Sequence, residues 1–147
     1  VQGCVERMAG HTVSVEFRHR SWFDAAQRDA TLAFERELGV VHTVVDAPQG
    51  CPHSVPAVWA TTHPECALLR LHGRNARTWN LKGATASSDR FDYDYPDAEL
   101  AELVASIRTK LPSRTLTHVI FNNNRDDQAQ RNATTLMSII GASSGAP

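Results

Sequence analysis

The chain has 147 residues, which is enough for one domain with a real core, and its 41% apolar and 21% charged content is typical of a globular protein. The net charge of −1 argues against a nucleic-acid binder that relies on a broad basic surface, and no apolar run reaches the roughly 20 residues of a membrane span. The amino end does not resemble a signal peptide, and three cysteines cannot form a complete disulfide framework. We therefore expect a cytoplasmic protein with neither a membrane nor a nucleic-acid partner.

Periodicity and boundary residues predict seven elements in the chain. In order they are a strand at Thr12–Arg18, a helix at Asp24–Leu38, strands at Val41–Asp46 and Ala67–His72, a helix at Asp97–Leu111, a strand at Leu116–Asn123 and a helix at Asp126–Ile140. Cys4 lies in a start without predicted structure, and residues 142–147 are expected to be a frayed tail.

The order of these elements predicts the fold class. Strands alternate with helices, which indicates an α/β domain with a mainly parallel sheet and right-handed crossovers over residues 1–147. The connection between the second and third strands is the exception, because its four prolines rule out a long helix there.

Ionisable residues fall on alternate positions of the strands. In a barrel, one face of each strand meets the helices and the other faces the interior. We expect Val41, Thr43 and Val45 to face the helices, which would leave His42, Val44 and Asp46 inside. The same alternation predicts an inward group near the carboxyl ends of all four strands, made of Glu16, Arg18, Asp46, Arg70, His72 and Asn122.

Two interpretations of this group remain open. In the functional one, Arg18 and Arg70 bind a phosphate or carboxylate, and Glu16, Asp46 and His72 act as acid–base catalysts. In the structural one, the charges form ion pairs that fix strand register, for instance Glu16 with Arg18 or Arg70.

Several stretches together resemble the domain of unknown function 72 family, also called YecE-like proteins. They are "VEFRHRSWF", "VVDAP", "LLRLHGRNARTWN", "FDYDYPDAELAELVASI" and "VIFNNNRDDQAQRNATTL". The resemblance implies a (β/α)8 barrel of uncharacterised function, with a ligand pocket at its mouth. The shared polar positions that it implies at this mouth are Glu16, Arg18, His19, Trp22, Asp46, Arg70, His72, Gly73, Arg74, Asn75, Trp79, Asn122 and Asn123. Among them we predict catalytic roles for Glu16, Asp46 and His72. We predict ligand binding by Arg18, His19, Trp22, Arg70, Arg74, Asn75, Trp79, Asn122 and Asn123.

The resemblance reaches only the second half of such a barrel, strands five to eight. A whole barrel needs roughly 250 residues, so we expect a truncated product, a piece of a split protein, or one half of a homodimer that rebuilds the barrel. The predicted function is to bind or transform a small anionic or sugar-like molecule. The alternatives are a non-catalytic half-barrel that completes a partner chain and an inactive remnant.

The sequence names no cofactor and does not decide whether the protein is an enzyme. Cys51, His53, His63 and Cys66 contain zinc-binding residue types, but their spacing is not that of a standard finger and they lie in a proline-rich loop. We therefore expect no metal site.

Overall fold

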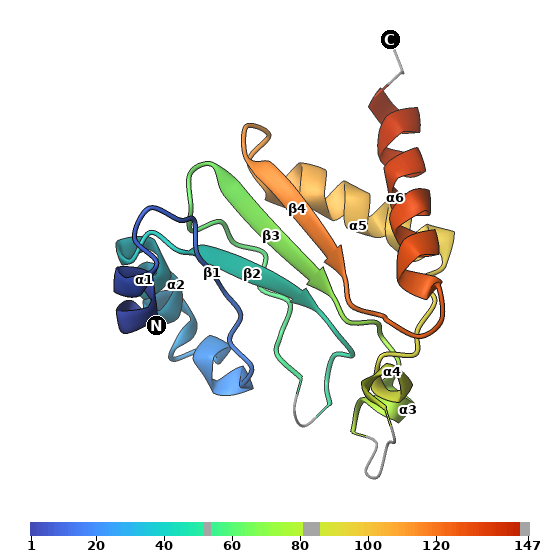
Figure 1. The fold of residues 1–147 in the computed structure, drawn as a ribbon, viewed down its shortest axis with the longest axis horizontal. Helices are drawn as coiled ribbons and strands as arrows, with labels where there is room; N and C mark the ends of the chain where they lie inside the picture. The colour runs from blue at the N-terminus through green and yellow to red at the C-terminus, as the bar shows by residue number, and fades with distance from the viewer. Residues whose placement is uncertain (52–53, 81–85, 145–147) are drawn as a thin grey trace.

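Four parallel strands form one sheet in the order β1-β2-β3-β4 (Figure 1). The computed structural model describes residues 1–51, 54–80 and 86–144. The strands are β1 (Ser14–Val15), β2 (Val41–Asp46), β3 (Cys66–Leu71) and β4 (Leu116–Phe121). The prediction of an α/β fold with a parallel sheet is confirmed.

Helices connect and flank the strands. They are α1 (Gln2–Arg7), the 3-10 turn η1 (Arg20–Phe23), α2 (Arg28–Glu37), α3 (Ala76–Trp79), α4 (Ser87–Arg90), α5 (Asp97–Lys110) and α6 (Gln128–Ser144). Helix α5 shows why the sequence forms them: acidic residues in its first turn and basic residues in its last complement the helix dipole, and its apolar residues recur at helical spacing. Helix α2 is followed by Gly39, whose φ of +65° is a conformation that glycine adopts readily.

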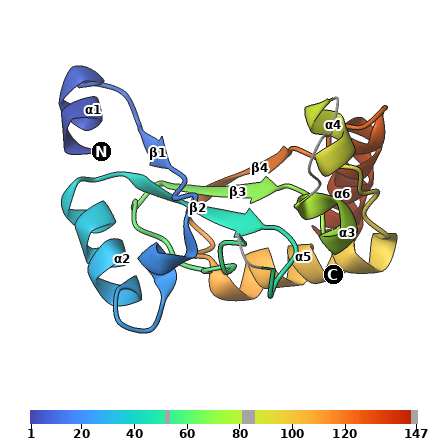
Figure 2. The same cartoon turned by 90° about the horizontal axis from the view of Figure 1, so that it is seen from below.

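Helices α2 and α5 both lie on the same face of the sheet and cover it (Figure 2). On that face Leu71 of β3 packs with Leu100 and Leu103 of α5, and Leu69 packs with Leu111. The opposite face, turned toward the viewer in Figure 1, carries Leu116 and Ile120 with 65% and 47% of their surface exposed. The sheet therefore has a packed side and an open side.

Several boundaries differ from the prediction. Cys4 lies in helix α1 rather than in an unstructured start. Helix α2 begins four residues later than expected, because Asp24 first caps a turn by accepting from the backbone N–H groups of Ala26 and Gln27. Helix α6 continues through Ser144, so residues 142–144 of the predicted tail are helical, and 145–147 lie outside the described residues.

The predicted orientation of β2 is wrong. Val44 pairs with Leu69 and Asp46 with Leu71 across a parallel ladder, and paired residues lie on the same face of a sheet. Both therefore belong to the side covered by the helices, and Val45 lies on the open side opposite Arg70. The strand is buried on both faces, so the polarity of its alternate residues does not reveal which face meets the helices.

The connection between β2 and β3 contains no helix or strand in its described parts, 47–51 and 54–65, as its prolines predict. In the described ranges we also find no helix with the length and apolarity needed to cross a membrane.

Candidate functional site

Four polar side chains close a ring of hydrogen bonds at the carboxyl ends of β1, β3 and β4. Arg70 donates from Nη1 to Glu16 Oε2 (2.9 Å) and from Nη2 to Asn122 Oδ1 (3.1 Å). Asn122 Nδ2 lies 3.0 Å from His72 Nδ1, and His72 Nε2 lies 3.3 Å from Glu16 Oε1. These residues, expected to lie together, are therefore in direct contact.

The donors of the ring fix the tautomer of His72. A guanidinium only donates, so the Asn122 atom facing Arg70 is the oxygen, and the amide nitrogen then faces His72. His72 Nδ1 must accept that hydrogen bond, which leaves the ring proton on Nε2, pointing at the Glu16 carboxylate.

Glu16 is held ionised by this arrangement. Burial alone would raise its pKa, but hydrogen bonds from His72 and Arg70 and the electrostatic attraction to both of these side chains outweigh burial and lower the pKa from 4.5 to about 2. Such a carboxylate is a weak base at neutral pH. It is better suited to holding cations in place than to accepting a proton.

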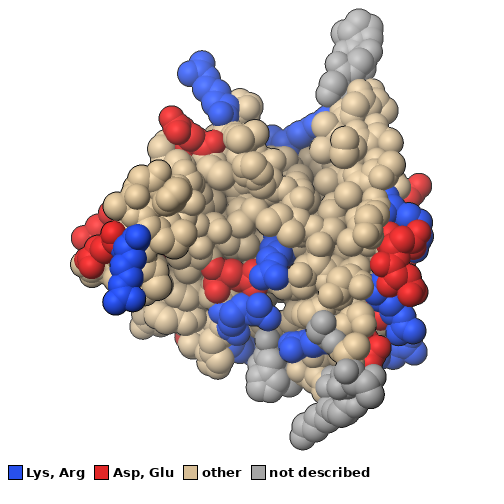
Figure 3. Space-filling model, viewed as in Figure 1, with Lys and Arg blue, Asp and Glu red and all other residues tan. Residues whose placement is uncertain are grey.

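The ring has an exposed side and an apolar side. Arg18 lies 3.1 Å from Glu16 and its side chain is 58% exposed, so much of this guanidinium faces solvent. His72 is buried, with the rings of Phe91 and Trp79 centred 5.4 Å and 6.0 Å away. Acidic and basic side chains gather at the centre of the open face (Figure 3). Two guanidinium groups around one carboxylate leave a net positive charge there, which suits an anion.

Asp46 and Arg74 form a separate network. Arg74 Nε and Nη2 both donate to the Asp46 carboxylate, at 2.9 to 3.1 Å, and Tyr95 Oη donates to it at 2.6 Å. Tyr95 also accepts from the backbone N–H of Gly73 at 2.9 Å. Burial and the neighbouring carboxylate raise the pKa of Tyr95 far above its usual value. Asp46 thus has its own partners, on the side of the sheet opposite the ring.

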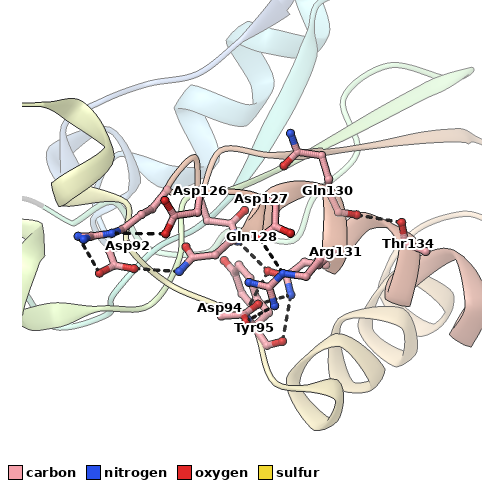
Figure 4. Close-up of polar contacts among 12 residues, drawn as sticks. Asp92, Asp94, Tyr95, Asp126, Asp127, Gln128, Gln130, Arg131 and Thr134 are labelled. Atoms are coloured by element: carbon pink, nitrogen blue, oxygen red, sulfur yellow. Dashed lines mark hydrogen bonds and ion pairs between the residues drawn. The ribbon is translucent and has the colours of Figure 1, made fainter.

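The segment of residues 92–95 connects the network of Asp46, Arg74 and Tyr95 to α6 (Figure 4). Gln128 donates to Asp92 and accepts from the backbone N–H of Tyr93, while Arg131 donates to Asp94. One turn further along the helix, the Asn132 side chain accepts from the Tyr95 N–H and donates to the Tyr95 carbonyl. Helix α6 therefore positions the tyrosine that holds Asp46.

The other predicted ligand-binding residues have structural partners. His19 Nδ1 accepts from the Ser21 N–H, and the Trp22 ring stacks on Phe17 with centroids 4.4 Å apart. The Asn75 side chain caps α3. Asn123 is fully buried and donates to the Tyr93 carbonyl and to Asn132.

Sequence reasoning missed Tyr95 and Asn132 as organisers of the site. The stretch "FDYDYP" was part of the family resemblance, but nothing in its residue types indicated which tyrosine would reach Asp46. The ranges that the structure describes contain no group of three or more His, Cys, Asp or Glu residues placed to hold a metal ion. His53 lies outside these ranges.

Comparisons with known proteins agree with the fold. The chain is 31% identical over 139 residues to the UPF0759 protein YunF of Bacillus subtilis (strain 168), covering 93% of this chain and 49% of that protein. The crystal structure of a DUF72 family protein from Enterococcus faecalis at 3.10 Å resolution matches with a TM-score of 0.86 and 28% identity, over 95% of this chain and 51% of that one. A DUF72 family protein from Thermotoga maritima matches with a TM-score of 0.78 and 33% identity, over 95% and 51%.

This chain thus spans about half the length of the relatives that it matches. The profile of the family described as "Protein of unknown function DUF72" matches residues 1–147 in full. The chain belongs to this family.

Proposed function

We propose that the chain is the second half of a TIM-type (β/α)8 barrel, strands five to eight, and that the barrel mouth binds a small anionic or sugar-like molecule. The single observation that carries the binding proposal is the ring of Glu16, Arg70, His72 and Asn122 beside the exposed Arg18. Ligands of parallel α/β folds bind at the carboxyl ends of the strands, which is where this ring lies. The parallel strand order and the greater length of the relatives support the half-barrel.

The chemistry of the ring favours binding over proton transfer. Glu16 fixes the two guanidinium groups, and their remaining N–H groups are donors for a phosphate or carboxylate. Catalytic roles for Glu16, Asp46 and His72 stay predictions. Each of these groups already has a hydrogen-bond partner within the protein.

The binding proposal is tested by NMR on the arginine Nε–H signals of this chain. Inorganic phosphate, acetate, a sugar phosphate and neutral glucose are titrated in turn at constant ionic strength. We expect the Arg18 and Arg70 signals to shift with at least one of these compounds. R70A should abolish the shift, R70K should weaken it, and R36A on the exposed side of α2 should leave it unchanged. An unchanged titration in R70A, or no shift with any compound, refutes the proposal.

A second candidate function is a non-catalytic half-barrel that completes another chain, either a second copy or a separate partner. It is favoured by the open side of the sheet, where Leu116 and Ile120 are exposed and a groove of about 380 Å³ lies beside Leu68 and His118. Light scattering on the wild type and on I120K tests it. A concentration-dependent dimer that I120K dissociates supports completion by a second copy, whereas a wild-type monomer at all concentrations contradicts completion by a second copy.

A further inference from the structure

A cavity of about 480 Å³ lies on the covered face of the sheet, between α5 and the connection from β2 to β3. Adjacent parallel strands are usually joined through a helix that packs on the sheet. This connection has no helix in its described parts, and it runs beside α5 on the covered face (Figure 2). The space that a crossover helix would fill is therefore only partly filled, and the volume that remains is within the range of small-molecule sites.

One wall of the cavity is a stripe of α5 with opposite charges at its two ends. Glu102, Ser106 and Lys110 line the cavity and follow one another at about one helical turn, so they share a face of the helix. Because each helical residue advances about 1.5 Å, Glu102 and Lys110 are about 12 Å apart along the axis. Within residues 1–51, 54–80 and 86–144, neither of these two side chains forms an ion pair.

The opposite wall is formed by the connection, and it offers an aromatic ring and an amide. Lys110 Nζ lies 5.0 Å from the centre of the Trp59 ring, so this indole marks the basic end of the cavity. Gln49 donates from Nε2 to the Ala47 carbonyl at 2.8 Å, which leaves its oxygen Oε1 as an acceptor at the wall. This wall can therefore contact a ligand between the two charges of α5.

We propose that this cavity binds a short peptide with free amino and carboxyl ends. Asp46 and Arg74 also line it, but they pair with each other at 2.9 Å, so the charges left for a ligand are those of Glu102 and Lys110. An extended tripeptide spans about 10 Å and carries an ammonium and a carboxylate at its ends, which matches this separation. Its peptide N–H groups suit the Gln49 oxygen. None of the four ring residues lines the cavity, so the site is separate from the mouth.

Triglycine tests the proposal by NMR on the indole N–H signals of this chain. W59F identifies the Trp59 signal, and we expect triglycine to shift that signal in a saturable way while the Trp22 signal stays in place. Triglycine with an acetylated amino end and an amidated carboxyl end lacks both charges. It should bind more weakly by up to about fivefold for each charge removed, as expected for charge pairs at partly exposed positions.

Charge reversal separates a site with two opposite ends from damage to the fold. E102K leaves two positive ends and K110E leaves two negative ends, so each variant should weaken triglycine binding about fivefold or more. The double variant E102K/K110E has one charge of each sign again and should recover binding, because triglycine can bind in the opposite direction. E37K, on the exposed side of α2, is the matched control and should leave the affinity unchanged.

Three results would overturn the proposal. They are an unmoved Trp59 signal, equal affinity for the capped peptide, and a double variant that binds as weakly as the single ones. Inorganic phosphate at constant ionic strength tests the separation from the mouth. It should not displace triglycine, and displacement would place the peptide at the ring instead of in this cavity.

Discussion

Replacing Glu16 by glutamine should destabilise the folded chain, and the loss should depend on pH. Glu16 is the common partner of Arg18, Arg70 and His72, at 2.9 to 3.3 Å. Its pKa falls from 4.5 to about 2 on folding, which corresponds to about 3 kcal/mol of stabilisation at neutral pH. The amide of E16Q carries no charge and places N–H donors against the donors of its neighbours.

The direction of the pH dependence follows from the sign of the shift. Because the folded-state pKa lies below the unfolded value, the contribution of Glu16 is complete above about pH 4.5 and is lost as the pH falls toward 2. Urea unfolding of wild type and E16Q at a series of pH values from 7 to 3 measures it. We expect a large difference in unfolding free energy at pH 7 that narrows below pH 4.5.

The control for this experiment is E6Q, which changes an exposed glutamate of α1 bonded only to Gln2 within its own helix. It should leave the unfolding free energy within about 0.5 kcal/mol of wild type. A difference between wild type and E16Q that stays the same from pH 7 to pH 3, or that is already absent at pH 7, refutes the assignment of Glu16 as the ionic centre of the ring.

Three further predictions concern the scaffold of the site. G73A should unfold at a lower temperature by calorimetry, because Gly73 has φ of +87° and an added Cβ would lie 2.5 Å from Tyr93 Cβ; an unchanged melting temperature would contradict this. Y95F should cost about 2 kcal/mol in urea unfolding, since it leaves the partly buried Asp46 carboxylate and the buried backbone N–H of Gly73 each short of one partner; a cost below about 0.5 kcal/mol would show that the hydroxyl is dispensable. H42F should cost about 3 to 5 kcal/mol because it leaves the fully buried Glu35 carboxylate, 3.0 Å from His42, without that partner. The double variant H42F/E35L should recover much of the loss; no recovery would contradict the contact between these two buried side chains.

The fold was predictable where the apolar pattern had a clear period. The bounds of Val41–Asp46 were predicted as observed, and α5 begins at Asp97 as predicted, because strong local signals coincide there with burial. The orientation of β2 was not predictable, since both of its faces are buried and its partners, such as Glu35 on α2, are set by tertiary packing.

The candidate site, like the fold, was predictable only in part. Residues of one face at the ends of β1, β3 and β4 were brought together as expected, because parallel strands align their carboxyl ends. Asp46 was assigned to the wrong group because its strand faces the other way. The reach of Tyr95 to Asp46 depends on a side-chain direction that no periodicity encodes.

The Tyr95 hydroxyl joins parts of the chain that are distant in sequence. Through it the end of β2 and the turn after β3 share a single anchoring point, and the backbone N–H of the same residue donates to Asn132 in the first turns of α6. A displacement of α6 along its axis would therefore pull on two strand ends at once. Any molecule that contacts α6 near Asn132 is therefore linked through Tyr95 to the carboxyl ends of β2 and β3.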